Sequence, residues 1–292
     1  MSLWPVLALA LLAYAIACIA IWKFQSRVIF YPLPKLADSP ANYGVSFENV
    51  TIPGSSFALH GWWMPAATDA PVMLYFHGNG GNIGAYASQA ARLRNLGYSV
   101  LIIDYRGYGQ SSGPFPCEER VYEDAELAWS WLTGTMKTAR QICIYGHSLG
   151  GAVAVEMATR HPDAAALIVE SSFTSALAMG KHLLVFRIFP LRMLLHHHFK
   201  SIAKVPTLRM PVLFMHGTRD LTVPCRMSRE LHAAAAERKQ LVIFRGAMHM
   251  NCGESAPDLY RDSVTSFVDR AFSSSVPRSA PNPAQDTLTP RP

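Results

Sequence analysis

The chain has 292 residues, enough for one large domain and an additional segment, and its 50% hydrophobic content with 16% charge describes a globular core plus a more apolar part. The net charge of +6 could suit nucleic acid or a membrane surface, but the sequence has no nucleic-acid motif and no long Lys/Arg run, which favours the membrane. Neither metal-ligand spacing nor a disulfide framework is evident in the five scattered cysteines, Cys18, Cys117, Cys143, Cys225 and Cys252.

The N-terminal sequence predicts a membrane anchor. From Leu3 to Trp22, 20 residues without charge follow one another, about the length a helix needs to cross a bilayer core. Interfacial aromatic and basic residues come next, namely Trp22, Lys23, Phe24 and Arg27. We expect residues 1–27 to be an uncleaved single-pass anchor that contributes nothing to the catalytic residues, and the positive-inside rule favours a cytoplasmic catalytic domain. A cleaved signal peptide is the alternative, although its usual basic start is missing.

From residue 45 onward, strand-like and helix-like segments alternate. The predicted strands are residues 45–52, 57–64, 72–76, 100–103, 142–145, 166–170, 211–216 and 240–244. Several are continuous apolar runs, as expected for strands that are covered on both faces. Predicted helices include residues 118–132, 226–237 and 257–272. The alternation predicts an α/β fold with a doubly wound, mostly parallel sheet and helices on both of its faces.

Residues 174–210 interrupt this rhythm. The segment carries six Lys/Arg, four His and no acid, interleaved with Leu, Phe, Ile and Met. We interpret it as a lid whose unpaired cations suit an anionic membrane surface, the alternative being a lid that packs on the core and is kept soluble by its charge. The triplet His196–His198 is expected on a helix, where consecutive side chains diverge, so it predicts a basic surface rather than a metal site. The Ser- and Pro-rich tail, residues 273–292, is expected to be disordered.

A Gly-x-Ser-x-Gly sequence, Gly146 to Gly150, lies between an apolar β-forming run and a helix-compatible run. Such a sharp strand-to-helix turn holds one serine, Ser148, at its tip in a strained conformation. The flanking positions therefore need residues without side-chain bulk, which Gly146 and Gly150 provide. The helix that follows favours negative charge near its N-terminus. The pattern predicts that Ser148 is a nucleophile.

A serine nucleophile needs a base, and the base needs a carboxylate to fix its tautomer. Asp220 follows one predicted strand and His249 follows the next, so both loops lie at the sheet edge that carries the serine. We expect Asp220 to be the acid and His249 the base. Glu170 also ends a strand and is the competing acid, although a structural role suits it better.

The developing oxyanion needs two backbone N–H groups that are placed before the reaction. One is expected from Leu149, directly after the serine, and the other from the glycine-rich loop after His77. Asn79 is the expected donor by register, with Gly80 as the alternative. A phosphate-binding loop is disfavoured because no Gly-Lys-Ser/Thr follows.

Five motifs together resemble the α/β-hydrolase superfamily: residues 77–82, 104–109, 146–151, 217–220 and His249. More narrowly, the chain resembles the small membrane-anchored serine hydrolases related to the catalytic domain of prolyl-oligopeptidase-type enzymes, a branch that includes depalmitoylating thioesterases, lysophospholipases and esterases. The resemblance covers residues 28–272. It implies a mostly parallel eight-stranded sheet with a helical lid, a Ser–Asp–His triad and no cofactor. Two local departures from the family pattern are Cys117 and the Met-Asn-Cys that follows His249.

These expectations combine into a membrane-anchored serine hydrolase with three segments: the anchor 1–27, the catalytic domain 28–272 with its lid, and the tail 273–292. It would cleave ester or thioester bonds of acyl or lipid substrates through a covalent acyl-enzyme, with the membrane and a lipid as partners, no metal and no nucleic acid. A peptidase of prolyl-oligopeptidase type is one alternative. A catalytically silent scaffold of the same fold is the other.

Overall fold

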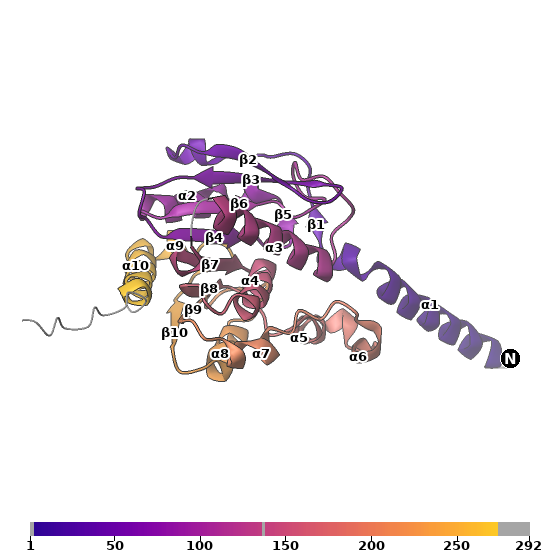
Figure 1. Cartoon of the computed structure of the whole chain (residues 1–292). Coiled ribbons are helices and arrows are strands. Elements are labelled where there is room, and N and C mark those ends of the chain that lie inside the picture. The colour runs from indigo at the N-terminus through magenta and orange to yellow at the C-terminus, as the bar shows by residue number, and fades with distance from the viewer. Residues whose placement is uncertain (1–2, 136–137, 274–292) are drawn as a thin grey trace, which may run out of the picture.

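The computed structural model describes residues 3–135 and 138–273 (Figure 1). Its central element is one eight-stranded sheet with the order β10-β9-β8-β7-β4-β6-β3-β2. The strands of this sheet are β2 Glu48–Pro53, β3 Ala58–Met64, β4 Val72–Phe76, β6 Ser99–Ile103, β7 Ile142–His147, β8 Ala166–Glu170, β9 Val212–Gly217 and β10 Lys239–Phe244. Six strands pair in parallel, while β3 is antiparallel to both of its neighbours, β2 and β6. The predicted mostly parallel eight-stranded sheet is confirmed.

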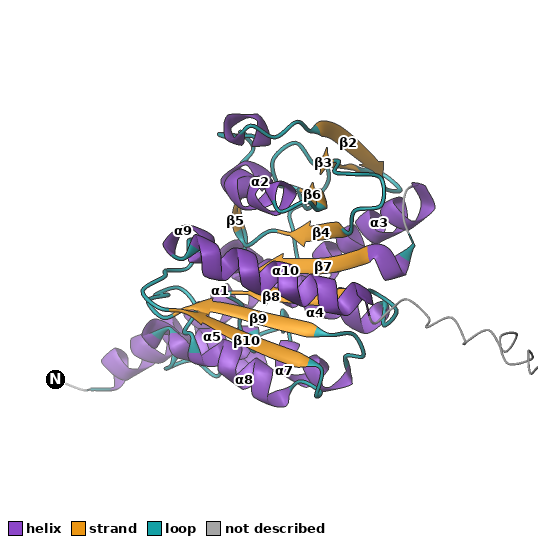
Figure 2. Ribbon diagram, turned by 90° about the vertical axis from the view of Figure 1, so that its left-hand side faces the viewer, coloured by secondary structure: helices purple, strands orange, loops and turns teal. Residues whose placement is uncertain are grey.

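Helices cover both faces of the sheet (Figure 2). One apolar core contains residues of α3 Glu118–Thr135, α4 Leu149–Arg160 and α8 Arg226–Ala234. The other contains residues of α2 Ala87–Asn95, α9 Cys252–Ser255 and α10 Pro257–Ser273. The strands alternate between the two cores, as Leu74 and Tyr75 of β4 do. Both faces of the sheet are therefore buried, in agreement with the continuous apolar strand runs. The tail that was expected to be disordered lies, beyond Ser273, outside the described residues.

A second, two-stranded sheet was not predicted. It pairs β1 Tyr31–Pro32 with β5 Gly80–Gly81 in parallel. The segment that follows α1 is thereby fixed to the glycine-rich loop after β4. This contact holds the end of the N-terminal helix next to that loop.

The N-terminal helix, α1, runs from Trp4 to Ile29 and projects from the body of the fold (Figure 1). Within the described residues it is the one helix that is long and apolar enough to cross a membrane. It ends where Phe30 becomes extended, and the Phe30 N–H donates to the Ser26 carbonyl at 2.8 Å. The helix therefore continues two residues past the predicted end of the anchor.

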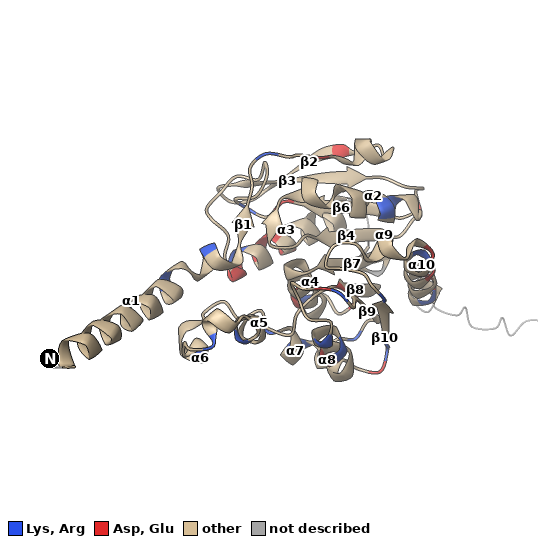
Figure 3. Ribbon diagram, turned by 180° about the vertical axis from the view of Figure 1, so that it is seen from behind, with Lys and Arg blue, Asp and Glu red and all other residues tan. Residues whose placement is uncertain are grey.

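The lid is helical, as predicted, but its helices are short. They are α5 Ala176–His182, η4 Leu184–Phe186, α6 Leu191–Leu194, α7 Ser201–Lys204 and η5 Val205–Thr207. Lysines and arginines of the lid are visible beside α5, α6 and α7 in Figure 3. One of them, Lys204, is paired with Glu156 of α4 at 2.5 Å, so the expectation of wholly unpaired cations is wrong at that residue.

The expectation for His196–His198 is also wrong in part. These residues lie in a non-helical connection between α6 and α7, because α6 ends at Leu194. His197 is 2% exposed and its Nε2 lies 2.7 Å from the Ser26 hydroxyl of α1. The middle histidine thus forms an internal contact between the lid and α1, whereas His196 and His198 are exposed.

Candidate active site

Ser148 lies between β7 and α4 with a φ of 56° and a ψ of −118°. A positive φ is energetically unfavourable for a residue other than glycine, so the surroundings of Ser148 must impose this conformation. Tight packing imposes it here: a Cβ on Gly146 would lie 2.1 Å from the Gly150 carbonyl oxygen, and one on Gly150 would lie 2.0 Å from that of Phe76. The strand and the helix can approach this closely only with glycine at both positions.

The structure brings the three expected catalytic side chains together at the carboxyl ends of β7, β9 and β10. The Ser148 Oγ lies 3.0 Å from the His249 Nε2. The His249 Nδ1 lies 2.6 Å from the Asp220 Oδ2. This hydrogen-bonded chain has the geometry that proton transfer from the serine requires.

Asp220 is held by more partners than the sequence predicted. Its Oδ1 accepts from the backbone N–H groups of Thr222 and Val223, both at 2.8 Å, and its Oδ2 lies 3.0 Å from the His216 Nε2. Burial opposes ionisation, but the hydrogen bonds from His216 and His249 outweigh it and hold the pKa of Asp220 well below its ordinary value. The carboxylate therefore stays charged. His216 was missed as a site residue, although its position four residues before Asp220 at a strand end was a usable signal.

His147 lies directly before the serine, at the end of β7. It is fully buried, and burial followed by the neighbouring His249 lowers its pKa to about 3. The neutral ring donates from Nε2 to the His249 carbonyl at 2.9 Å. This bond positions the backbone of the expected base.

Glu170, the competing acid, lies elsewhere. Its carboxylate accepts a hydrogen bond from the Tyr145 hydroxyl, and burial raises its pKa. The Glu170 backbone contributes to the turn through its carbonyl, which accepts from the Ser148 N–H at 2.9 Å. The structural role expected for Glu170 fits these contacts, and the geometry favours Asp220 as the acid.

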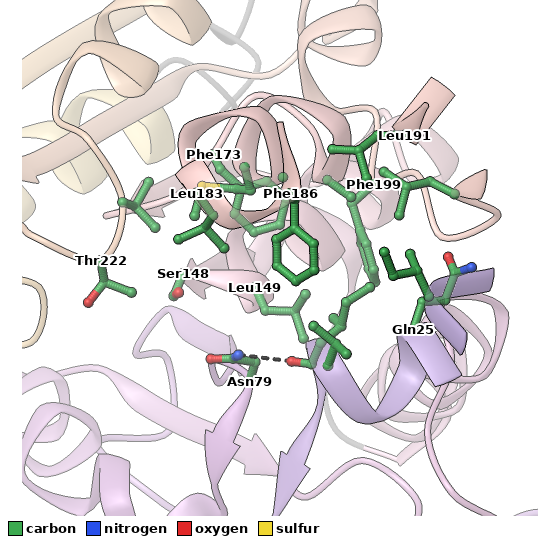
Figure 4. Close-up of a pocket in the computed structure, with 18 residues that line it drawn as sticks. Gln25, Asn79, Ser148, Leu149, Phe173, Leu183, Phe186, Leu191, Phe199 and Thr222 are labelled. Atoms are coloured by element: carbon green, nitrogen blue, oxygen red, sulfur yellow. Dashed lines mark hydrogen bonds between the residues drawn. The ribbon is translucent and has the colours of Figure 1, made fainter. Parts of the chain in front are cut away.

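The two expected oxyanion donors, Leu149 and Asn79, both lie beside Ser148 in the same cavity. Leu149 is the first residue of α4, where backbone N–H groups have no partner within the helix. The loop that carries Asn79 touches the serine, since a Cβ on Gly78 would lie 3.2 Å from the Ser148 Cβ. The Asn79 side chain donates to the Ile29 carbonyl at 2.8 Å, the contact drawn as a dashed line in Figure 4. The end of α1 therefore anchors this loop.

The cavity above Ser148 is almost wholly apolar. Of its 18 lining residues, only Gln25, Asn79, Ser148 and Thr222 are polar. Figure 4 shows Ser148 toward one side of it, Gln25 of α1 toward the other, and Phe186 of the lid between them. Four lining residues come from α1: Ile21, Gln25, Val28 and Ile29. The helix therefore forms a wall of the cavity, which the sequence did not predict, although it supplies none of the three expected catalytic side chains.

A family model described as serine aminopeptidase, S33, matches residues 67–191. The chain is 36% identical to an uncharacterized protein of Mycobacterium tuberculosis over 249 residues, which cover 84% of this chain and 87% of that protein. It is 31% identical to the alpha/beta hydrolase domain-containing protein WAV2 of Arabidopsis thaliana over 273 residues, or 85% and 88% of the two chains. The chain belongs to the α/β-hydrolase superfamily.

Other similarities of this α/β-hydrolase are more distant. It is 34% identical to the lysophosphatidylserine lipase ABHD12 of Danio rerio over 188 residues, 59% of this chain and 49% of that protein. Its fold matches an esterase of Pyrococcus furiosus with a TM-score of 0.68 at 18% identity, covering 83% and 98% of the two chains. It also matches a bacterial membrane phospholipase A with a TM-score of 0.61 at 18% identity, covering 91% and 98%. The hydrolase family and the lipase relative together support ester-hydrolase activity.

Proposed function

We propose that this α/β-hydrolase is a membrane-anchored serine hydrolase that cleaves ester or thioester bonds of acyl lipids through an acyl-enzyme. The observation that carries the proposal is the chain of contacts from Ser148 through His249 to Asp220, placed at the end of an apolar cavity. In this mechanism His249 takes the Ser148 proton as the hydroxyl attacks the acyl carbonyl, and then gives that proton to the leaving group. In the second half of the reaction, a water molecule activated by the same histidine attacks the acyl-enzyme and releases the acyl group as the acid.

Asp220 holds His249 in the tautomer whose Nε2 accepts the serine proton. Its charge also stabilises the imidazolium that forms. The negative charge on the substrate oxygen is met by the N–H groups of Leu149 and Asn79 and by the positive end of α4. The low pKa of Asp220 keeps its carboxylate ionised at mildly acidic pH.

An acyl chain is the substrate part that suits the cavity, because 14 of its 18 lining residues are apolar. The names of the lysophosphatidylserine lipase and of the membrane phospholipase support a lipid substrate. Anchoring by α1 would keep the cavity at the membrane where such substrates are concentrated. The basic residues that follow the apolar stretch favour a cytoplasmic catalytic domain by the positive-inside rule.

The test is a hydrolysis panel with purified full-length protein in detergent. It contains p-nitrophenyl esters of short and long acids, lysophospholipids, an acyl-CoA and aminoacyl p-nitroanilides, each assayed with the wild type and with Ser148→Ala. We expect long acyl esters to be cleaved with the highest kcat/KM and Ser148→Ala to be inactive. Preference for the aminoacyl substrates would support the peptidase alternative instead, which the description of the matching family model favours. No turnover and no labelling by a fluorophosphonate would support the silent scaffold.

A further inference from the structure

The lid touches α1 far from the end at which α1 joins the catalytic domain. The Tyr14 ring stacks on Phe189 of the lid at 5.5 Å between centroids, with 8° between the ring planes. The Tyr14 hydroxyl donates to the Ile188 carbonyl at 2.8 Å. Figure 1 shows the lid elements α5 and α6 on the side of the body from which α1 projects.

The position of Tyr14 fixes the depth of this contact in a membrane. A spanning helix needs about 20 residues for the hydrocarbon core. The helix begins at Trp4, so the earliest possible span starts near Leu3. A span of 20 residues from Leu3 ends at Trp22, on the side of the catalytic domain. Tyr14 precedes Trp22 by eight residues, which is about 12 Å along a helix at 1.5 Å per residue. Half of the core is about 15 Å thick, so Tyr14 lies well inside the catalytic-side leaflet.

The surface of the lid around this contact is suited to lipid. We call residues 183–194 the lid tip. Its large exposed apolar side chains are Leu183, Leu184, Val185, Ile188 and Met193, of which Met193 is 83% exposed. Exposed charge on the tip comes from Arg187 and Arg192, and the tip contains no acid. Arginines bury their stems in an apolar layer while the guanidinium reaches the phosphates, whereas a carboxylate would be repelled there.

We propose that the lid tip is inserted in the leaflet beside α1 and that the cavity above Ser148 opens directly into the lipid. This inference rests on the proposed membrane anchoring by α1. A second copy of the chain or a partner helix would fit the exposed apolar residues less well, because neither would account for two exposed arginines without a carboxylate in the patch.

The cavity connects the leaflet to the serine. Ile21 of α1 and Leu183 and Leu195 of the lid line it, so its walls come from the two elements that would lie in lipid. Ile21 and Gln25 flank the Trp22–Lys23 boundary of the apolar stretch, which places this wall at the depth of the headgroups. An acyl chain would pass from the leaflet between α1 and the lid tip and bring its carbonyl to Ser148 without crossing water.

Depth-dependent fluorescence quenching in phosphatidylcholine vesicles tests the insertion. Full-length protein with Cys18, Cys117 and Cys225 replaced by serine or alanine would carry one bimane label, at Leu12→Cys in α1, Ile188→Cys in the lid tip, or Leu259→Cys in α10. Lipids with nitroxides deep in their acyl chains are the quenchers. We expect the labels at positions 12 and 188 to be quenched and the label at position 259 to be unaffected. Leu259 is a matched control because it is an exposed apolar residue, 45% exposed, on an element outside the lid.

The outcomes separate this inference from the anchoring on which it rests. Quenching at position 12 without quenching at position 188 would leave the anchor intact and overturn the insertion of the lid tip. Absence of quenching at both positions would overturn the anchoring itself. As a functional readout, Ile188→Asp should lower hydrolysis of a long-chain ester in vesicles by about tenfold or more, because a carboxylate in the leaflet is costly. Hydrolysis of a short soluble ester by Ile188→Asp should be unchanged, and so should both activities of Leu259→Asp. Equal vesicle activity of wild type and Ile188→Asp would contradict the proposal.

Discussion

Gln25→Met tests whether α1 holds the lid in place. The Gln25 Oε1 accepts from the backbone N–H groups of His196 and His197, both at 2.9 Å, and its Nε2 donates to the Leu194 carbonyl at 3.1 Å. The side chain is 2% exposed. The Nε2 also lies 2.6 Å from the His196 Nδ1. Methionine has a similar length and no amide, so the substitution removes the three bonds to the lid backbone and this fourth contact with little change in shape.

The size of the effect follows from the number of bonds. Each partly buried hydrogen bond contributes about 1 kcal/mol net, so the three bonds to the lid backbone alone give about 3 kcal/mol that favours the docked lid. Since 1.4 kcal/mol is a factor of ten, the ratio of docked to undocked lid should fall by roughly 100-fold. The sheet should keep its stability, because neither of the two apolar cores contains Gln25.

Amide hydrogen exchange followed by mass spectrometry measures this ratio. In Gln25→Met, peptides from residues 183–199 should exchange roughly 100-fold faster, while peptides from β4 and β7 keep the wild-type rate. Ser26→Ala is a graded control, because it removes the single contact between the Ser26 hydroxyl and the His197 Nε2, and it should accelerate the same peptides by about fivefold. Lid exchange at the wild-type rate in Gln25→Met would refute the role of Gln25 in holding the lid against α1. Equal acceleration in the lid and the sheet would show global destabilisation instead.

Three further predictions concern the site and its support. Asp220→Asn should lower kcat by roughly three to four orders of magnitude, because the histidine would be held in the wrong tautomer. Glu170→Gln should leave kcat within about a factor of ten. The reverse order of effects in steady-state kinetics would make Glu170 the acid. Gly78→Ala should lower kcat by about tenfold or more, because the added Cβ would lie 3.2 Å from the Ser148 Cβ and 2.5 Å from the Tyr86 hydroxyl. An unchanged kcat would show that this loop is not part of the oxyanion site. The pKa of His147 is about 3 when folded and 6.5 when free, so the unfolded chain takes up a proton that the folded chain does not, and stability rises with pH between these values. His147→Gln should therefore reduce the slope of unfolding free energy against pH by about 1.4 kcal/mol per unit in detergent-solubilised protein, and an unchanged slope would contradict a buried neutral histidine.

The sheet and the position of its site could be predicted because their signals are local. Continuous apolar runs place β4 at Val72–Phe76 and β8 at Ala166–Glu170, where the structure has them. Parallel strands end at one edge, so residues that follow successive strands converge without any knowledge of the contacts. Ser148, Asp220 and His249 meet for this reason, although their roles remain a proposal.

The contacts between α1, the lid and the cavity could not be predicted in this way. Gln25 reaches backbone atoms about 170 residues away, and nothing in the sequence near either partner marks that pairing. The expected helix at His196–His198 is not present, because α6 ends at Leu194 and His197 instead contacts Ser26 of α1. Such pairings depend on how two elements dock, and local periodicity carries no information about docking.

The central claim is that Ser148 carries the acyl group of a lipid substrate during turnover. Rapid acid quench of the full-length enzyme mixed with a long-chain lysophospholipid or p-nitrophenyl ester, followed by peptide mass spectrometry, tests this claim directly. The account predicts that the peptide containing Ser148 gains the mass of the acyl group, and that Asp220→Asn changes how much of it accumulates but not the residue modified. Turnover of the substrate with the acyl group on another residue, or with Ser148 unmodified at every quench time, would contradict it.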